Sequence, residues 1–393
     1  MKRIIIIITV FSVMLGALYA QDQGNQAKEP DFYTQLLDSQ ATTEGRLRVV
    51  RAAAADGAKA EFFAYALDNL FSTLPSSQSS SHLRETEELL QFLVIKLGEE
   101  KHTAAGPNLW KVYITFSNPI IRAEALASLG KIQAADYLPR IIDIIKEISI
   151  DPGTDRIGRE QIAYGAIASL EEYKESDGYL PVFLVSAGWY SDRLKNRARE
   201  VMPKIMDDPS EPLISVLKGS TYNLTVKFSA LQTLEGSDAT AQQKSKGAVT
   251  ALDDAWKTTT NNNPDRLTLI RLRKLSIDMI RRYGTEDTNI YHPLQKSYRE
   301  GVDEEEQIYV IAALSALATD DSVRILSNFL REINDRQSRG VPLREDERLV
   351  RVIIPALGST GKSEAKNALR EVIATNWTNA VHVLAQDALK KIP

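Results

Sequence analysis

One octapeptide of this sequence has the residue types of a phosphate-binding loop. Residues 356–363 read ALGSTGKS, the form of that loop in which alanine replaces the first glycine. Such a loop works where backbone N–H groups after a strand surround an anion at the N-terminus of a helix. The mostly apolar residues 349–354 (LVRVII) precede the octapeptide and could form that strand. A nucleotide is therefore the first candidate ligand, and the rest of the sequence tests that candidate.

Other residues that could carry catalysis are scattered. The chain has no cysteine, and its four histidines show neither a metal-ligand spacing nor an H-E-x-x-H motif. No G-x-S-x-G motif is present either. The acidic run 303–306 precedes a predicted helix, where carboxylates favour the N-terminal dipole, rather than forming a calcium or acid–base site. We therefore expect no catalytic residue, metal or cofactor, and an enzyme is the least favoured class. The histidines are His82, His102, His292 and His382.

A basic segment between residues 265 and 282 is a candidate binding surface. Six cations lie along one predicted helix and are opposed only by Asp265 and Asp278. The favoured interpretation is a solvated helix face with ion pairs to the neighbouring acidic repeat. The functional interpretation is a docking site for an acidic partner or an anionic envelope polymer. The six are Arg266, Arg271, Arg273, Lys274, Arg281 and Arg282.

The helices that must position these residues form a repeat. Similar helix ends recur every 32 to 46 residues, and the residue four positions before each is alanine or serine in seven of eight instances. Positions four apart share one helix face, so a small residue there lets a second helix approach while the larger one fills the core. The helix ends are Leu129, Leu170, Met202, Leu234, Ile280, Leu317, Leu357 and Leu389. The preceding residues are Ala125, Ala166, Ala198, Ala230, Ser276, Ala313, Ile353 and Ala385.

Each repeat contains a second helix that begins with its own signal. Pro139, Pro181, Pro212 and Pro293 precede apolar helical segments, and proline suits the first helical turn because its missing N–H costs nothing there. No segment shows the even alternation of a half-buried strand. The sequence therefore predicts an all-α fold.

These features resemble the HEAT-repeat family. Residues 118–130 (NPIIRAEALASLG) resemble the first helix and turn of that family, and residues 321–330 and 363–373 resemble its second helices. The resemblance runs from residue 118 to residue 393, and its degenerate motif indicates an architecture rather than a particular member. It implies one α-solenoid of stacked helical hairpins, in which neighbouring repeats supply the core that a single repeat lacks.

Aromatic residues offer a second candidate surface. Trp189, Tyr190, Trp256, Tyr298 and Trp377 lie near the C-terminal ends of predicted second helices. In a solenoid these ends fall along one edge, and exposed tryptophan and tyrosine make good interface anchors. The alternative is that they fill the gaps between successive repeats, and this interpretation is slightly favoured.

The repeat also explains the octapeptide. Residues 353–357 occupy the position of residues 125–129, where the repeat places the end of a helix. Gly358 then matches Gly130 as a left-handed residue after a helix, and Ser363 becomes the N-cap of the next helix. We therefore interpret residues 356–363 as a turn of the repeat and expect no nucleotide.

The N-terminal part of the chain is predicted to be divergent. Helices are expected over residues 46–70, 83–97 and 109–116, within an N-terminal cap of divergent repeats at 31–117 that precedes the HEAT-like repeats at 118–393. Composition favours loops at residues 76–81, 239–247 and 258–264.

The first residues have the layout of a secretory signal peptide. Lys2 and Arg3 precede an apolar run at residues 4–18, and Ala20 is the expected cleavage point, followed by a flexible leader at 21–30. The net charge of −4 gives no reason to expect nucleic acid. The only membrane association expected is through the signal peptide before cleavage.

Together these features predict a non-enzymatic scaffold or adaptor in the bacterial periplasm. The expected partner is another envelope protein, bound over an extended concave face of the solenoid. The alternative is an envelope-polymer-binding module that uses the basic helix. An envelope enzyme with an unrecognised site is less favoured.

Overall fold

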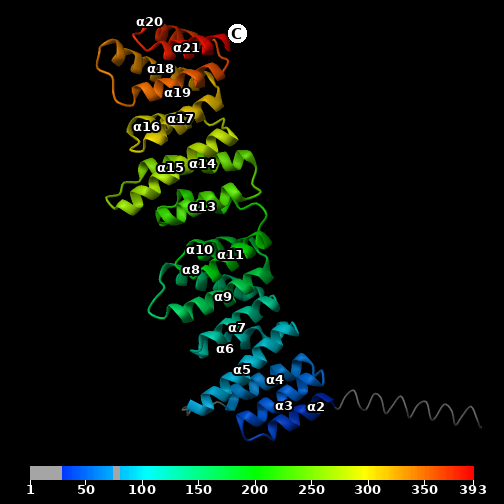
Figure 1. The fold of residues 1–393 in the computed structure, drawn as a ribbon. Helices are drawn as coiled ribbons and strands as arrows, with labels where there is room; N and C mark the ends of the chain where they lie inside the picture. Colours follow the sequence, from blue (N-terminus) through cyan, green and yellow to red (C-terminus); the bar gives the residue numbers. More distant parts are fainter. Residues whose placement is uncertain (1–28, 74–79) are drawn as a thin grey trace, which may run out of the picture. The chain divides into compact units, whose positions relative to one another are not determined.

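The structure is a computed structural model that describes residues 29–73 and 80–393. The predicted signal peptide at 1–20 and residues 21–28 of the predicted leader lie outside the described residues, as do positions 76–79 of the predicted first loop. All regular structure in the described part is helical, with no strand (Figure 1), which confirms the all-α prediction. The chain divides into two compact units, Met1–Met206 (unit 1) and Asp207–Pro393 (unit 2).

Unit 1 packs its helices in two layers. Helices α5, α7, α9 and α11 follow one another in the first layer, and α6, α8 and α10 form the second. The helices are α2 (Glu29–Asp38), α3 (Thr43–Ala55), α4 (Ala60–Thr73), α5 (Ser80–Glu99), α6 (Gly106–Thr115), α7 (Pro119–Lys131), α8 (Leu138–Ile150), α9 (Arg156–Tyr173), α10 (Tyr179–Ala187) and α11 (Asp192–Ile205).

Unit 2 repeats the same plan. Helices α13, α15, α17, α19 and α21 pack in sequence as the first layer, and α12, α14, α16, α18 and α20 as the second. The helices are α12 (Ser210–Lys218), α13 (Leu224–Gly236), α14 (Ala241–Lys257), α15 (Asn263–Tyr283), α16 (Tyr291–Glu300), α17 (Glu304–Leu317), α18 (Asp320–Ser338), α19 (Asp346–Ser359), α20 (Ala365–Ala374) and α21 (Asn379–Lys390).

The predicted column of small residues lies in the first layer of each unit. Its eight members lie in α7, α9 and α11 of unit 1 and in the five first-layer helices of unit 2, one in each helix. All eight have no measurable exposure to solvent. The larger residues four positions later are buried as well, except Leu317 and Leu389, which are half-buried. The spacing therefore predicted which face of these helices enters the core.

Two glycines of this repeat have a different role from the predicted one. Gly130 and Gly358 lie inside α7 and α19 rather than after them. A Cβ at Gly130 would lie 2.4 Å from the backbone of α9, and one at Gly358 would lie 2.8 Å from a side chain of α21. Close helix packing is therefore what requires glycine. The left-handed residues that follow are Gln133, with φ of 52°, and Gly361, with φ of 66°.

All four predicted irregular segments extend too far. Residues 80 and 81 belong to α5, and residues 29 and 30 begin α2. The expected loop at 239–247 ends at Thr240, because Thr240 and Gln243 form a reciprocal capping box that starts α14. The segment 258–264 is irregular only up to Asn262, the N-cap of α15.

Candidate functional site

The octapeptide at 356–363 lacks the geometry of a phosphate loop. The residues before it are part of α19 instead of a strand. The Nζ atom of Lys362 lies 2.8 Å from a carboxylate oxygen of Asp320, so the lysine forms an ion pair with α18. The predicted N-cap at Ser363 is wrong, because α20 begins at Ala365 and its N-cap position is Glu364. The segment is a turn between two packed helices.

The five aromatic residues lie at the predicted helix ends but are not freely exposed. Tyr190, Tyr298 and Trp377 are buried, and Trp189 and Trp256 are half-buried. Exposure as interface anchors is therefore wrong for the three buried residues. The position of the edge was predicted from helix periodicity, whereas the direction of each ring depends on the neighbouring helix.

Each of the three tryptophans uses its indole N–H to bridge neighbouring second-layer helices. Within unit 1, Trp189 donates to the backbone carbonyl of Ile148 at the end of α8, over 3.0 Å. Within unit 2, Trp256 donates to the hydroxyl of Ser297 on α16 over 2.7 Å. Trp377, which follows α20, donates to the Asn334 side chain on α18 over 2.9 Å. These rings thus fill the gaps between repeats.

The two tyrosines perform the same bridging. Tyr298 on α16 stacks on Phe329 of α18, with ring centroids 3.7 Å apart and planes 8° from parallel. The hydroxyl of Tyr190 lies 3.0 Å from that of Ser149 on α8. Burial raises the pKa of Tyr190 to about 12, although the hydrogen bond with Ser149 opposes that shift.

The raised pKa of Tyr190 predicts a loss of stability in alkali. An unfolded tyrosine ionises near pH 10, whereas the folded one resists ionisation up to about pH 12. This contribution is therefore complete below pH 10 and is lost as the pH rises through 12, by about 2 kcal/mol. Urea unfolding at pH 9 and pH 12 should show a smaller pH effect in Tyr190→Phe than in the wild type. The matched control, Tyr164→Phe at an exposed position on α9, should follow the wild type.

A fourth tryptophan, absent from the predicted surface, belongs to a similar cluster in unit 1. Trp110 on α6 stacks on Tyr113 at 5.1 Å and lies 5.5 Å from Tyr137, just before α8. The guanidinium of Arg140 lies 5.2 Å from the Trp110 ring. Trp110 occurs within its helix rather than at the end, so a search restricted to helix ends missed it.

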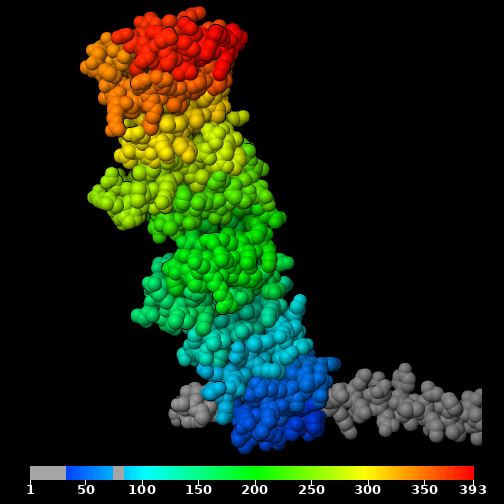
Figure 2. All heavy atoms as spheres, in the orientation of Figure 1, coloured from blue at the N-terminus to red at the C-terminus, as the bar shows by residue number. Residues whose placement is uncertain are grey.

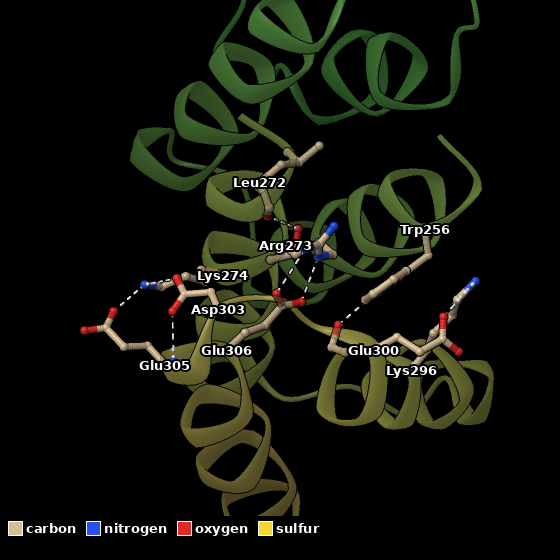
Figure 3. Close-up of polar contacts among 11 residues, drawn as sticks. Trp256, Leu272, Arg273, Lys274, Lys296, Glu300, Asp303, Glu305 and Glu306 are labelled. Carbon is tan, nitrogen blue, oxygen red and sulfur yellow. Dashed lines mark hydrogen bonds and ion pairs between the residues drawn. The ribbon is translucent and has the colours of Figure 1, made fainter. Parts of the chain in front are cut away.

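The basic helix α15 contains a buried ion pair that joins two repeats (Figure 3). Arg273 of α15 and Glu306 of α17 are both buried. The Nε and Nη2 atoms of Arg273 lie 2.7 and 3.1 Å from the two carboxylate oxygens of Glu306, a bidentate geometry. The guanidinium also lies 4.4 Å from the centroid of Trp256. This pair is part of the core of unit 2 and leaves no charge for a partner.

Further cations of α15 are also paired. Lys274 bonds to Glu305 and lies 3.1 Å from Asp303, the N-cap residue of α17 (Figure 3). Burial alone would raise the pKa of Asp303. Hydrogen bonds from the Glu305 N–H and from Lys274 outweigh burial and hold that pKa below its ordinary value. Arg281 and Arg282 pair with Asp278, at 2.8 and 2.9 Å.

The acidic run 303–306 is therefore the partner of the basic helix. Beyond the predicted role at a helix N-terminus, two of its carboxylates neutralise Lys274 and one is buried against Arg273. The interpretation of the basic segment as a face with ion pairs to the neighbouring repeat fits this geometry. Two of the six predicted cations, Arg266 and Arg271, are exposed and form no ion pair within the described residues.

These two arginines lie beside a group of exposed apolar side chains. In unit 2 the connections from each second-layer helix to the next first-layer helix lie at one end of the layers, and we call this end the unit 2 connection edge. It has four apolar residues that are each at least half exposed. They are Leu267 in α15, Val302 before α17, and Val341 and Leu343 before α19.

Helix α15 also reaches further along this edge than its neighbours. It begins 17 residues before its repeat position Ile280, whereas α13 begins 10 residues before Leu234 and α17 begins 13 residues before Leu317. At 1.5 Å per residue, four more residues than α17 add about one turn. Arg266 lies in this additional turn and Leu267 directly follows it, which makes the start of α15 a projecting feature.

The described part of the chain has neither a group of three metal-ligating side chains nor a helix that could cross a membrane. Among residues 29–73 and 80–393, no group of three or more His, Asp or Glu side chains is arranged to hold a metal ion. None of the helices in this part of the chain is both long and apolar enough to cross a membrane. His292 is exposed at the start of α16, and the ring of His382 bonds to the carbonyl of Thr375 at 2.9 Å.

The chain matches no model of a known protein family, and no curated protein matches it. The candidate surface is therefore defined by the contacts and exposure of this chain alone. It consists of the unit 2 connection edge together with Arg266 and Arg271.

Proposed function

We propose that this chain is a HEAT-like α-solenoid that acts as a non-enzymatic scaffold or adaptor, exported to the bacterial periplasm. The observation that carries the proposal is the column of eight fully buried residues, seven of them alanine or serine, at one position of successive first-layer helices. Repeats joined in this way supply each other's core and leave long outer surfaces for binding. The layout of residues 1–20 as a signal peptide supports export.

We place the partner contact on the unit 2 connection edge instead of on a concave face. The outward sides of the second-layer helices in unit 2 already carry ion pairs between repeats. Arg299 lies 2.6 Å from Glu332, and Arg331 lies 3.3 Å from Glu371. The connection edge, by contrast, exposes apolar side chains beside unpaired arginines, the combination expected of a protein interface.

The charge of this edge favours an acidic partner. Three arginines of this edge form no ion pair within the described residues: Arg266, Arg271 and Arg344. Two carboxylates of the edge, Asp265 and Glu345, have no cationic partner among the same residues. This edge therefore has more unpaired arginines than unpaired carboxylates. A protein segment that presents carboxylates around an apolar side chain would complement it.

Site-specific photo-crosslinking in intact cells tests this proposal. A photoreactive residue at Leu267 or at Val302 should give one discrete adduct with an envelope protein. The same residue at Val383, which is exposed on α21, should give none. Adding Arg266→Glu and Arg271→Glu should reduce the adduct about tenfold, because both unpaired charges are reversed. A folded protein that gives no adduct at either edge position would contradict the proposed contact.

The polymer-binding alternative has less support, because four of the six cations of α15 are neutralised within the fold. It predicts pelleting with purified envelope material, and loss of pelleting in the same Arg266→Glu, Arg271→Glu variant.

Mass spectrometry of the exported chain tests localisation separately, since cleavage at the expected site leaves Gln21 at the N-terminus.

A further inference from the structure

Unit 1 exposes four isoleucines beside two neighbouring connections. Ile150 and Ile157 are 83% and 77% exposed, and Ile114 and Ile120 are 62% and 46% exposed. Single exposed apolar residues are ordinary on proteins, but a cluster of large aliphatic residues marks an interaction surface. We call these four residues the isoleucine patch.

The four residues flank two neighbouring connections. Ile114 is at the end of α6 and Ile120 at the start of α7, and Ile150 and Ile157 hold the same positions in α8 and α9. The first-layer helices α7 and α9 pack closely, since a Cβ at Gly165 would lie 2.2 Å from the backbone of α7. Both connections therefore lie at the same end of the layers.

The α8–α9 connection forms the loop at the left of unit 1 in Figure 1, and the same segment projects from the surface in the space-filling view (Figure 2). Ile150 and Ile157 lie at the two ends of this connection and are largely exposed. A second protein surface can reach them without displacing any helix of unit 1.

The charges around the patch cancel. Residues 112–121 contain no charged side chain. The α8–α9 connection and the first turn of α9 contain Asp151, Asp155, Arg156 and Arg159, two groups of each sign. The two carboxylates cap backbone N–H groups of their own segment, and Arg159 donates to a carbonyl of the same connection at 2.8 Å. No net charge would therefore oppose the approach of an identical surface.

We propose that the isoleucine patch is the contact through which two copies of this chain associate. A twofold contact places the same patch on both sides, so the patch must be compatible with itself. An apolar surface without net charge meets this condition, whereas a twofold contact at the unit 2 connection edge would bring its unpaired arginines close to those of the second copy. An anionic lipid surface would favour a net positive charge, which this patch lacks.

The size of the patch fits the core of such an interface. Taking roughly 100 Å² of apolar surface for each isoleucine, the exposed fractions amount to about 270 Å² per copy. This is about a third of the ~800 Å² per partner that stable interfaces bury, and such interfaces have an apolar core within a polar rim. The turns on either side of the two connections would provide the rim.

The mass of the chain in solution tests this inference directly. Light scattering on the chain purified as the cell produces it should give twice the monomer mass at high micromolar concentration. Ile150→Glu combined with Ile157→Glu should weaken the association at least about a hundredfold, because four carboxylates would then meet in one apolar contact. Val383→Glu, a matched change at an exposed position in unit 2, should leave the dimer intact.

Cysteine crosslinking gives a second readout, because a disulfide traps the contact covalently. Because the chain has no cysteine, Ile157→Cys creates a single thiol, and mild oxidation should yield a disulfide-linked dimer on a non-reducing gel. Val383→Cys should remain monomeric under the same oxidation. A wild-type chain that is monomeric at every concentration would overturn the inference. A dimer that persists in the folded Ile150→Glu, Ile157→Glu variant would overturn it too.

Discussion

Replacing Glu306 with leucine should lower the free energy of unfolding of unit 2 by about 3–5 kcal/mol, because it leaves a buried arginine without its counterion. Both members of the pair are buried, and the carboxylate of Glu306 is the only one bonded to Arg273 within the described residues. Water cannot easily replace the lost partner, since the guanidinium is also covered by the Trp256 ring at 4.4 Å. Urea unfolding of wild type and variant measures the difference.

Two controls separate burial from a general effect of charge removal. Combining Glu306→Leu with Arg273→Met replaces the pair with apolar side chains of similar size, and should recover most or all of the stability. Glu332→Leu breaks an ion pair in which both side chains are about half exposed, and should cost less than about 1 kcal/mol. If Glu306→Leu costs no more than Glu332→Leu, the pair is not buried in solution.

This ion pair also shows how far the sequence could predict the site. The basic helix and the acidic run one repeat later were both apparent, and so was their pairing in general terms. The sequence could not show which of the four neighbouring carboxylates enters the core. That choice depends on the rotation of α17 against α15, which brings Glu306 inward and leaves Glu304 and Glu305 exposed.

The small-residue column was predictable because it does not depend on how one helix is rotated against another. It repeats in eight first-layer helices, so its meaning follows from helical periodicity alone. The glycines of the same repeat were assigned correctly as special positions but with the wrong cause. A glycine near a helix end has the same letter whether it permits a left-handed turn or a close helix contact, and only the three-dimensional neighbour distinguishes the two.

The binding surface was the least predictable part. The sequence left open whether tryptophan and tyrosine form an exposed edge or fill the gaps between repeats, and it slightly favoured the second. Their rings turn toward neighbouring helices, where each gains a hydrogen bond or a stacked ring. The exposed apolar residues are instead mainly aliphatic, such as Ile150 and Leu267. Isoleucine and leucine are common in the core as well, so their composition alone gives no sign of exposure.

The close contact between α7 and α9 predicts a second large effect, at Gly165. Its added Cβ would lie 2.2 Å from the carbonyl oxygen of Ala123, a backbone atom that cannot move without shifting the helix. Gly165→Ala should therefore lower the free energy of unfolding of unit 1 by at least about 2 kcal/mol. This value is the difference between an overpacking cost of about 3 kcal/mol and a gain of about 1 kcal/mol in helix propensity.

Gly236→Ala is the matched control, because it makes the same substitution within a first-layer helix of unit 2 where no atom lies within 4 Å of the new Cβ. Its free energy of unfolding should stay unchanged or rise by up to about 1 kcal/mol. Urea unfolding of both variants decides the matter. If Gly165→Ala is as stable as Gly236→Ala, then α7 and α9 do not pack at glycine distance. In that event, their connections would not be held at the spacing that the isoleucine patch requires.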